Sequence, residues 1–274
     1  MQARVLAVAN QKGGVGKTTT TVNLAAALAL ADQTVLVVDL DPQANLTSGL
    51  GQKPAGEDAS APLTVFDALT NDNVPVLDDY LSPTSVPGLS LVAADGSLAG
   101  AELVLAGLER RERRLRPLLH EARRRFDYVL IDTPPSLGLL TVNALIAAEA
   151  VLIPMTCEYY ALEGLATLMA TLRRVQATFN PRLGVAGVVL TMADLRTNLG
   201  QQVAADVRNV FGGAVFETII PRNVRLAEAP SHGLPVILYD VRSRGAEAYQ
   251  TLAMEFLTRT RGAAAAAEGM TQRG

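Results

Sequence analysis

The sequence predicts an α/β fold, in which a mostly parallel, twisted sheet carries helices on both faces. Short apolar runs rich in β-branched residues alternate with longer helical patterns, which is typical of repeated strand-helix-strand units. The chain has 274 residues, of which 49% are hydrophobic and 19% are charged, so it can bury a large core and is not disordered as a whole. We expect a single domain, because no linker or internal repeat divides the chain.

Six apolar runs are the expected strands. They cover residues 5–9, 34–39, 128–132, 151–154, 185–190 and roughly 215–219. Between the first two lies an alanine- and leucine-rich segment that predicts a helix over 17–31. Glycine, proline, aspartate and serine favour a loop over 51–62, and residues 83–100 carry turn signals around one short apolar run at 89–94.

Net charge, cysteine count and hydrophobic pattern argue against several classes of protein. The formal charge of -3 gives no global electrostatic reason to bind nucleic acid. The one cysteine, Cys157, cannot by itself form an internal disulfide, a structural zinc site or an iron-sulfur cluster. No apolar run is long enough to cross a membrane, and the start lacks a basic region with a cleavage site, so we expect a cytoplasmic protein without membrane contact.

Lysine is rare and unevenly placed. Of 24 lysines and arginines only Lys12, Lys17 and Lys53 are lysine, and two of them stand five residues apart. A chain that otherwise uses arginine keeps lysine where a compact, rotatable ammonium is needed in place of a planar fork. The pattern draws attention to the segment around Lys12 and Lys17.

That segment, QKGGVGKTT over residues 11–19, follows the first expected strand and opens the first expected helix. Its glycines let successive N–H groups and the helix N-terminus point at phosphate oxygens. Lys17 would reach the β and γ phosphates, and Thr18 would offer its hydroxyl to Mg²⁺. The alternative is a glycine-rich turn without chemistry, but its placement between strand and helix argues for a P-loop NTPase fold. Gln11 and Lys12 depart from the common phosphate-loop pattern, which has glycine at position 11.

Carboxylates end two other expected strands. Asp39 and Asp41 follow the second strand, and Asp132 closes the strand at 128–132. The carboxyl ends of parallel strands meet at one edge of the sheet, beside the phosphate loop. Asp132 there fits a role in holding a water bound to Mg²⁺. Each aspartate alone could also be a simple capping residue.

Three motifs together resemble a known family. KGGVGKT, VVDLDPQ and LIDTPPS look like the ParA/MinD group of deviant Walker A ATPases. IIPRNVRLAEAPSHGLPV at 219–236 and YDVRSRGAEAY at 239–249 resemble its ParA/Soj chromosome-partitioning branch. The similarity runs from residue 5 to about 256 and thins between 51 and 125. It implies an ATPase domain over 1–261, and we expect a disordered tail over 262–274.

The resemblance implies Mg²⁺-dependent hydrolysis of ATP, slow until it is stimulated. Lys12 would cross to the nucleotide of a partner subunit, Lys17 would bind the phosphates, and Asp41 would act on the attacking water. Thr18 would bind Mg²⁺, with Asp39 and Asp132 acting through water. The implied nucleotide contacts are Lys12, Gly13, Gly14, Val15, Gly16, Lys17, Thr18 and Thr19, with Met192, Pro221, Arg222 and Asn223 on the adenine side.

The resemblance also implies partners. They are a second copy of the chain in the ATP state, non-specific double-stranded DNA on the nucleoid, and a ParB-type centromere-binding protein, with DnaA as a further candidate. Gly13 would have to stay small because two phosphate loops face each other in the dimer. DNA contacts map onto Arg196 and Arg225, which could otherwise form ordinary surface salt bridges.

Other functions need features that are weak here. A MinD-like division-site or other positioning ATPase is the alternative, but membrane binding would need a basic amphipathic C-terminal helix, and the tail is alanine-rich. Iron-sulfur relatives would need paired cysteines. The segment from Arg110 to Arg125 holds eight arginines on an expected helix that is interrupted near Pro117. It is either a solvated helix face or a second candidate for DNA contact.

Overall fold

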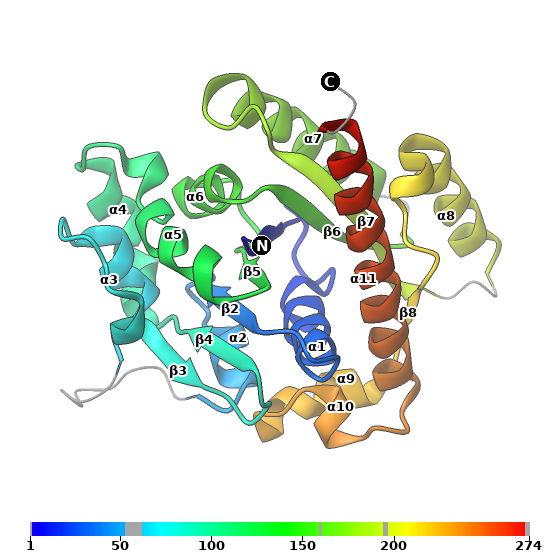
Figure 1. Ribbon diagram of the computed structural model, residues 1–274. Helices are drawn as coiled ribbons and strands as arrows, with labels where there is room; N and C mark the ends of the chain where they lie inside the picture. Colours follow the sequence, from blue (N-terminus) through cyan, green and yellow to red (C-terminus); the bar gives the residue numbers. More distant parts are fainter. Residues whose placement is uncertain (1, 53–61, 159–160, 194–196, 272–274) are drawn as a thin grey trace.

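The computed structural model describes residues 2–52, 62–158, 161–193 and 197–271. In these ranges the chain forms one sheet of eight strands in the order β3-β4-β2-β5-β1-β6-β7-β8 (Figure 1). All neighbouring strands are parallel except β3 and β4, which run antiparallel at one edge. The expected α/β fold with a mostly parallel sheet is confirmed.

The strands and helices alternate along most of the chain. The strands are β1 Arg4–Val8, β2 Val35–Asp39, β3 Leu81–Pro83, β4 Leu89–Val92, β5 Tyr128–Asp132, β6 Ala150–Thr156, β7 Gly184–Ala193 and β8 Ile220–Pro221. The helices are α1 Lys17–Ala29, α2 Asn45–Gly49, α3 Val65–Thr70, α4 Ala101–Ala106, α5 Arg116–Arg125, α6 Leu139–Ala147, α7 Ala161–Thr178, α8 Asn198–Phe211, α9 Val224–Glu228, α10 Val236–Tyr239 and α11 Arg244–Thr271.

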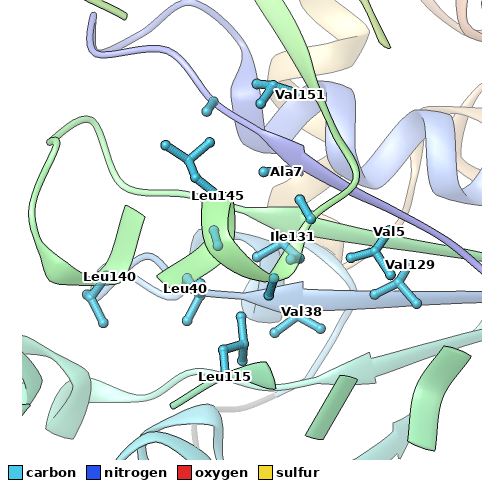
Figure 2. Close-up of a cluster of buried hydrophobic side chains, with 14 of the residues drawn as sticks. Val5, Ala7, Val38, Leu40, Leu115, Val129, Ile131, Leu140, Leu145 and Val151 are labelled. Atoms are coloured by element: carbon cyan, nitrogen blue, oxygen red, sulfur yellow. The ribbon is translucent and has the colours of Figure 1, made fainter. Parts of the chain in front are cut away.

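Two apolar layers cover the two faces of the sheet, because alternate residues of each strand point to opposite sides. One layer packs strand residues such as Val5 and Val38 against α3 to α8, and Figure 2 shows its centre around Ile131 and Leu145. The other packs Leu6 and the remaining alternate strand positions against α1 and α9 to α11. Helices therefore lie on both faces, as the sequence predicts.

The strands adjacent to the phosphate loop are close to their expected positions. The strand expected at 5–9 is β1 Arg4–Val8, and the helix expected over 17–31 is α1 Lys17–Ala29. The apolar run at 89–94 contributes β4, which pairs with β2, and the three residues of β3 pair with it from the edge. Because β3 is so short and ends in Pro83, it carries too little pattern to be recognised from sequence.

The strand expected at 215–219 is wrong. Only Val215 bridges to Val188 of β7, and regular pairing resumes at β8. Between these two points the N–H groups of Glu217 and Thr218 donate to the carboxylate of Glu255 on α11, each at 2.9 Å. A side chain from a distant helix thus takes the place of a neighbouring strand.

The arginine-rich segment is broken as expected. A short 3-10 helix, Arg111–Arg113, precedes α5, and Pro117 lies in the first turn of α5, where the missing proline N–H costs nothing. Helix α11 runs to Thr271, past the expected domain boundary at 261. The boundary and the disordered tail at 262–274 stay predictions. Within the described ranges, none of the helices has the length and apolar character needed to span a lipid bilayer.

Candidate functional site

The phosphate loop joins β1 to α1 through two left-handed glycines. Gly14 has φ 71° and Gly16 has φ 83°, a region that residues with a side chain rarely adopt. Gly16 is also the N-cap of α1, and it makes no side-chain capping hydrogen bond. The loop backbone therefore ends at an uncapped helix N-terminus, where N–H groups and the helix dipole favour an anion.

Two side chains that sequence reasoning missed hold this loop. Asn10 accepts a hydrogen bond from the Lys12 N–H at 3.0 Å and donates its amide to the Pro154 carbonyl of β6 at 2.8 Å. From β7, the Thr191 hydroxyl donates to the Val15 carbonyl at 2.8 Å. A polar residue directly after an apolar strand was the only signal for Asn10.

Lys17 is the buried cation of the loop. The residue is 7% exposed, and its ammonium donates to the Lys12 carbonyl at 3.3 Å. Burial lowers the pKa of Lys17, and attraction to Asp132 and Asp41 opposes that shift. A phosphate group beside this ammonium would therefore meet a charge already removed from water, where ion pairing is strong.

Asp132 lies fully buried at the end of β5. Its two oxygens accept hydrogen bonds from the hydroxyls of Thr18, at 2.6 Å, and Thr21, at 3.1 Å. Burial, together with the nearby charge of Asp39, raises the pKa of Asp132 to about 8. Thr21 was not predicted, although the run of four threonines at 18–21 was visible in the sequence.

Asp39 is the register partner of Asp132 on the neighbouring strand β2. Its carboxylate accepts the N–H of Thr47 at 2.9 Å and the Thr47 hydroxyl at 2.8 Å, which ties it to α2. Burial raises the pKa of Asp39 to about 6. Asp41, 7% exposed, accepts the N–H of Gln43 at 3.0 Å.

This donor set fits Mg²⁺ bound together with a nucleotide. Asp39 and Asp132 are adjacent buried carboxylates whose pKa values burial raises, and a hard cation next to them would favour their ionised forms. Thr18 adds a hydroxyl on the same side. Among the described residues no cluster of three or more His, Cys, Asp or Glu side chains forms a metal site, so phosphate and water oxygens would have to complete the shell.

Lys12 contacts an acid that was not predicted. Its ammonium lies 2.5 Å from a carboxylate oxygen of Glu158, just beyond β6. This hydrogen bond lowers the pKa of Glu158. The side chain of Lys12 is 33% exposed, so the cation stands at the surface, where a second chain could approach.

The predicted adenine-side residues come together. Met192, Pro221, Arg222 and Asn223 line one cavity of about 340 Å³ beside the phosphate loop. Gly16 and Thr19 form part of the same wall. Apolar groups complete it: Ile220, Val224, Leu226, Ala227 and the ring of Tyr249. An apolar cavity with a few polar groups next to an anion-binding loop suits a nucleotide base.

Of the two predicted DNA-binding residues, the structure describes only one. Arg196 lies outside the described residues. Arg225 is exposed on α9, and its guanidinium pairs with Glu228 at 2.7 Å and Asp240 at 3.2 Å. Several arginines of the segment from Arg110 to Arg125 also have acidic partners: Arg111, Arg114, Arg123 and Arg125.

Comparison with known proteins now places the chain. A family model described as an AAA domain matches residues 3–185. The chain is 53% identical over 252 residues to the sporulation initiation inhibitor protein Soj of Bacillus subtilis, covering 92% of this chain and 97% of that one. The chain belongs to the ParA/Soj family of chromosome-partitioning ATPases. Another member, the chromosome partitioning protein ParA of Caulobacter vibrioides, is 51% identical over 260 residues, or 94% of this chain and 95% of its own.

Solved structures with a similar fold include one with a bound nucleotide. Cobyrinic acid a,c-diamide synthase from Mycobacterium smegmatis, with bound ADP and magnesium, has a TM-score of 0.79 at 38% identity, over 94% of this chain and 96% of its own. The cell division ATPase MinD of Pyrococcus furiosus has a TM-score of 0.74 at 26% identity, over 93% and 99%. The P-loop ATPase fold expected from the phosphate loop is confirmed.

Proposed function

We propose that this ParA/Soj-family ATPase segregates a chromosome or plasmid. It binds ATP with Mg²⁺, forms a sandwich dimer, binds DNA without sequence preference on the nucleoid, and is released when a ParB-type partner stimulates hydrolysis. The observation that carries the proposal is the buried Lys17 ammonium beside Asp132 and Asp41, next to a cavity of base size. Close relatives are named for partitioning, which favours this role over a MinD-like one.

In this proposal the loop backbone and Lys17 bind the phosphates of ATP, and the cavity around Met192 and Asn223 holds the base. Thr18, Asp39 and Asp132 hold Mg²⁺, the aspartates through water. The metal supplies positive charge next to the phosphates and so offsets their charge during hydrolysis. The hydrogen bonds to Asp39 from Thr47 keep its carboxylate at this edge of the sheet.

Asp41 orients the attacking water. Its buried carboxylate is fixed by the Gln43 N–H, so one oxygen is occupied and its position is set before the nucleotide binds. Preorganised groups of this kind lower the barrier without tightening ground-state binding.

Dimerisation brings Lys12 to the nucleotide of the partner. For that, the Lys12 ammonium has to exchange Glu158 for phosphate oxygens, which carry more charge. Gly13 fits the facing loops: a Cβ there would meet nothing closer than Pro135 at 3.8 Å in the single chain. A demand for glycine at this position therefore has to come from the second subunit.

The DNA surface includes Arg225 and Arg196, one copy from each subunit. Non-specific binding depends on the number of phosphates neutralised, so a dimer that joins two such surfaces binds more tightly than one chain. DnaA is a further candidate partner.

The test is binding to an arbitrary DNA duplex with a non-hydrolysable ATP analogue, with ADP and without nucleotide. We expect tight binding only with the analogue, and a slope of log affinity against log salt that falls by roughly two units in the Arg225→Ala dimer. Equal binding in all three states would contradict nucleotide-dependent DNA binding. A parallel arm with anionic lipid vesicles tests the MinD-like alternative, which vesicle binding with the analogue would support.

A further inference from the structure

Arg225, the described member of the proposed DNA contacts, is engaged by two acids of its own chain. Its Nη1 lies 2.7 Å from Oε2 of Glu228, and its Nε lies 3.2 Å from Oδ2 of Asp240. The Tyr239 hydroxyl also donates to Glu228 Oε2, at 3.4 Å. The guanidinium therefore meets carboxylates through two of its three nitrogens.

A DNA phosphate needs the same donors. Guanidinium binds carboxylate and phosphate through the same planar fork of N–H groups, so one Arg225 cannot serve both fully. Binding DNA through Arg225 thus means giving up Glu228, Asp240 or both. These two acids also repel the phosphate backbone while they stay in place.

The acid side of this cluster is held firmly, unlike that of many surface ion pairs. Asp240 ends α10, where its N–H donates to the Val236 carbonyl at 2.8 Å and its Oδ1 accepts from the Arg242 N–H at 3.2 Å. Helix α10 is fixed to α1 by a buried hydrogen bond of 2.7 Å from the Val236 N–H to the Asn23 side chain. Asp240 therefore loses little freedom when it pairs with Arg225.

The arginine side is anchored as well. Asn223 caps α9 by accepting the Arg225 N–H at 2.9 Å, which fixes the start of the helix that carries the guanidinium. Helices α9 and α10 lie next to each other near one end of α1 (Figure 1). Ion pairs gain strength when their partners are positioned in advance, so this cluster persists where an isolated exposed pair would not.

We propose that Glu228 and Asp240 act as a built-in competitor of DNA for Arg225, and that they lower the affinity of the protein for every DNA sequence alike. The proposal rests on the proposed DNA-binding function. It assigns the acids a role that neither the nucleotide site nor the hydrophobic core requires. Removing an acid frees the arginine and leaves the phosphate-binding loop untouched.

The experiment measures duplex binding of the full chain loaded with the ATP analogue. Asp240→Asn keeps the size of the side chain and the oxygen that accepts from the Arg242 N–H. Because a dimer has two copies, we expect DNA binding to tighten by about 2- to 30-fold, the range set by exposed ion pairs counted twice. Glu228→Gln should act in the same direction.

A matched control separates competition from general charge. Glu247, exposed in the first turn of α11, forms no ion pair within the part of the chain that the structure describes. Glu247→Gln changes the net charge by the same amount, so its effect on affinity should be clearly smaller. A thermal melt checks that each variant is folded.

Repeating the measurements in an Arg225→Ala background separates the proposed DNA contact of Arg225 from the proposed competition by the two acids. There, Asp240→Asn should gain no more than Glu247→Gln does, because no guanidinium remains to be freed. If Arg225→Ala leaves DNA affinity unchanged, the proposed DNA contact at Arg225 is wrong. If Arg225→Ala weakens binding but Asp240→Asn tightens it no more than Glu247→Gln does, the competitor role is overturned while the DNA contact stands.

Discussion

At the scale of single residues, the candidate site places one lysine and two aspartates close together and largely out of contact with water. Lys17, Asp39 and Asp132 are all less than a tenth exposed, and burial is the first cause of each of their pKa shifts. A nucleotide bound with its metal ion carries both negative and positive charge. The phosphates match the lysine and the metal matches the aspartates, so charge complementarity favours binding the two together.

The pKa of Asp132 predicts how stability depends on pH without nucleotide. Burial raises this pKa from 3.8 to about 8, so between these values the folded state keeps a proton that the unfolded state has lost. The free energy of unfolding should then fall as pH rises through this window, by no more than about 1.4 kcal/mol per pH unit for one proton. Urea unfolding at several pH values measures the slope. Asp132→Asn should flatten it, and an unchanged slope would contradict the assignment.

Asp41 predicts a separation between binding and hydrolysis. Asp41→Asn keeps an oxygen for the Gln43 N–H but removes the charge that would act on water. We expect ATP affinity and ATP-dependent dimer formation close to those of the unmodified protein, and hydrolysis at least about 100-fold slower. Calorimetry and phosphate release measure the two. A marked loss of ATP affinity would instead make Asp41 part of the metal and phosphate site.

At the scale of elements, the sequence predicts a strand or helix correctly where the residues that determine the element lie within it. The phosphate loop, β5 and α1 were predicted because apolar runs and glycines fall inside them. The error at 215–219 has a different cause: the N–H groups of Glu217 and Thr218 donate to Glu255, a residue of α11 that lies far along the chain. No local pattern records such a partner.

The same reason explains what was missed in the site. Asn10, Thr191 and Glu158 act through residues on other elements, and nothing in their immediate neighbours marks them. The adenine-side residues were found only through resemblance to a family. Their shared cavity depends on β7, β8 and α9 meeting in space.

Glu255 therefore predicts the stability of this corner of the fold. Glu255→Ala leaves the N–H groups of Glu217 and Thr218 without their acceptor and removes the ion pair to Arg259. We expect a loss of about 1–3 kcal/mol in the free energy of unfolding. Urea unfolding measures it, with Gln250→Ala, exposed on the same helix, expected to stay within about 0.5 kcal/mol. Equal stability of the two variants would refute the role of Glu255.

At the scale of the whole molecule, the described chain holds the parts of one nucleotide site, but Lys12 turns to its own Glu158. Two of the three cations assigned to contacts outside the subunit lie in the described ranges, and both of these, Lys12 and Arg225, pair with acids of the same chain. In the single subunit these two charges are therefore paired within the chain. The proposed dimer and DNA contacts would require these two pairs to be exchanged for pairs with phosphate.

Gly13 gives the test of the dimer. In the single chain a side chain at Gly13 meets only ordinary contact with Pro135, so Gly13→Val should fold and bind ATP. It should fail to dimerise, because the branched side chain would stand between two facing loops. Size-exclusion chromatography with the ATP analogue measures this, and Lys17→Ala serves as the control, because we expect it to lose tight nucleotide binding. An ATP-dependent dimer of Gly13→Val would contradict the facing arrangement.

The order of the site along the chain has a consequence for synthesis on the ribosome. The phosphate loop directly follows β1, whereas the cavity assigned to the base also needs Met192, Pro221 to Asn223 and Tyr249 of α11, which come much later in the sequence. During synthesis the anion-binding loop is therefore made long before the walls that would recognise a base. We expect selectivity for the base to begin only when α11 has been made and has packed against α1.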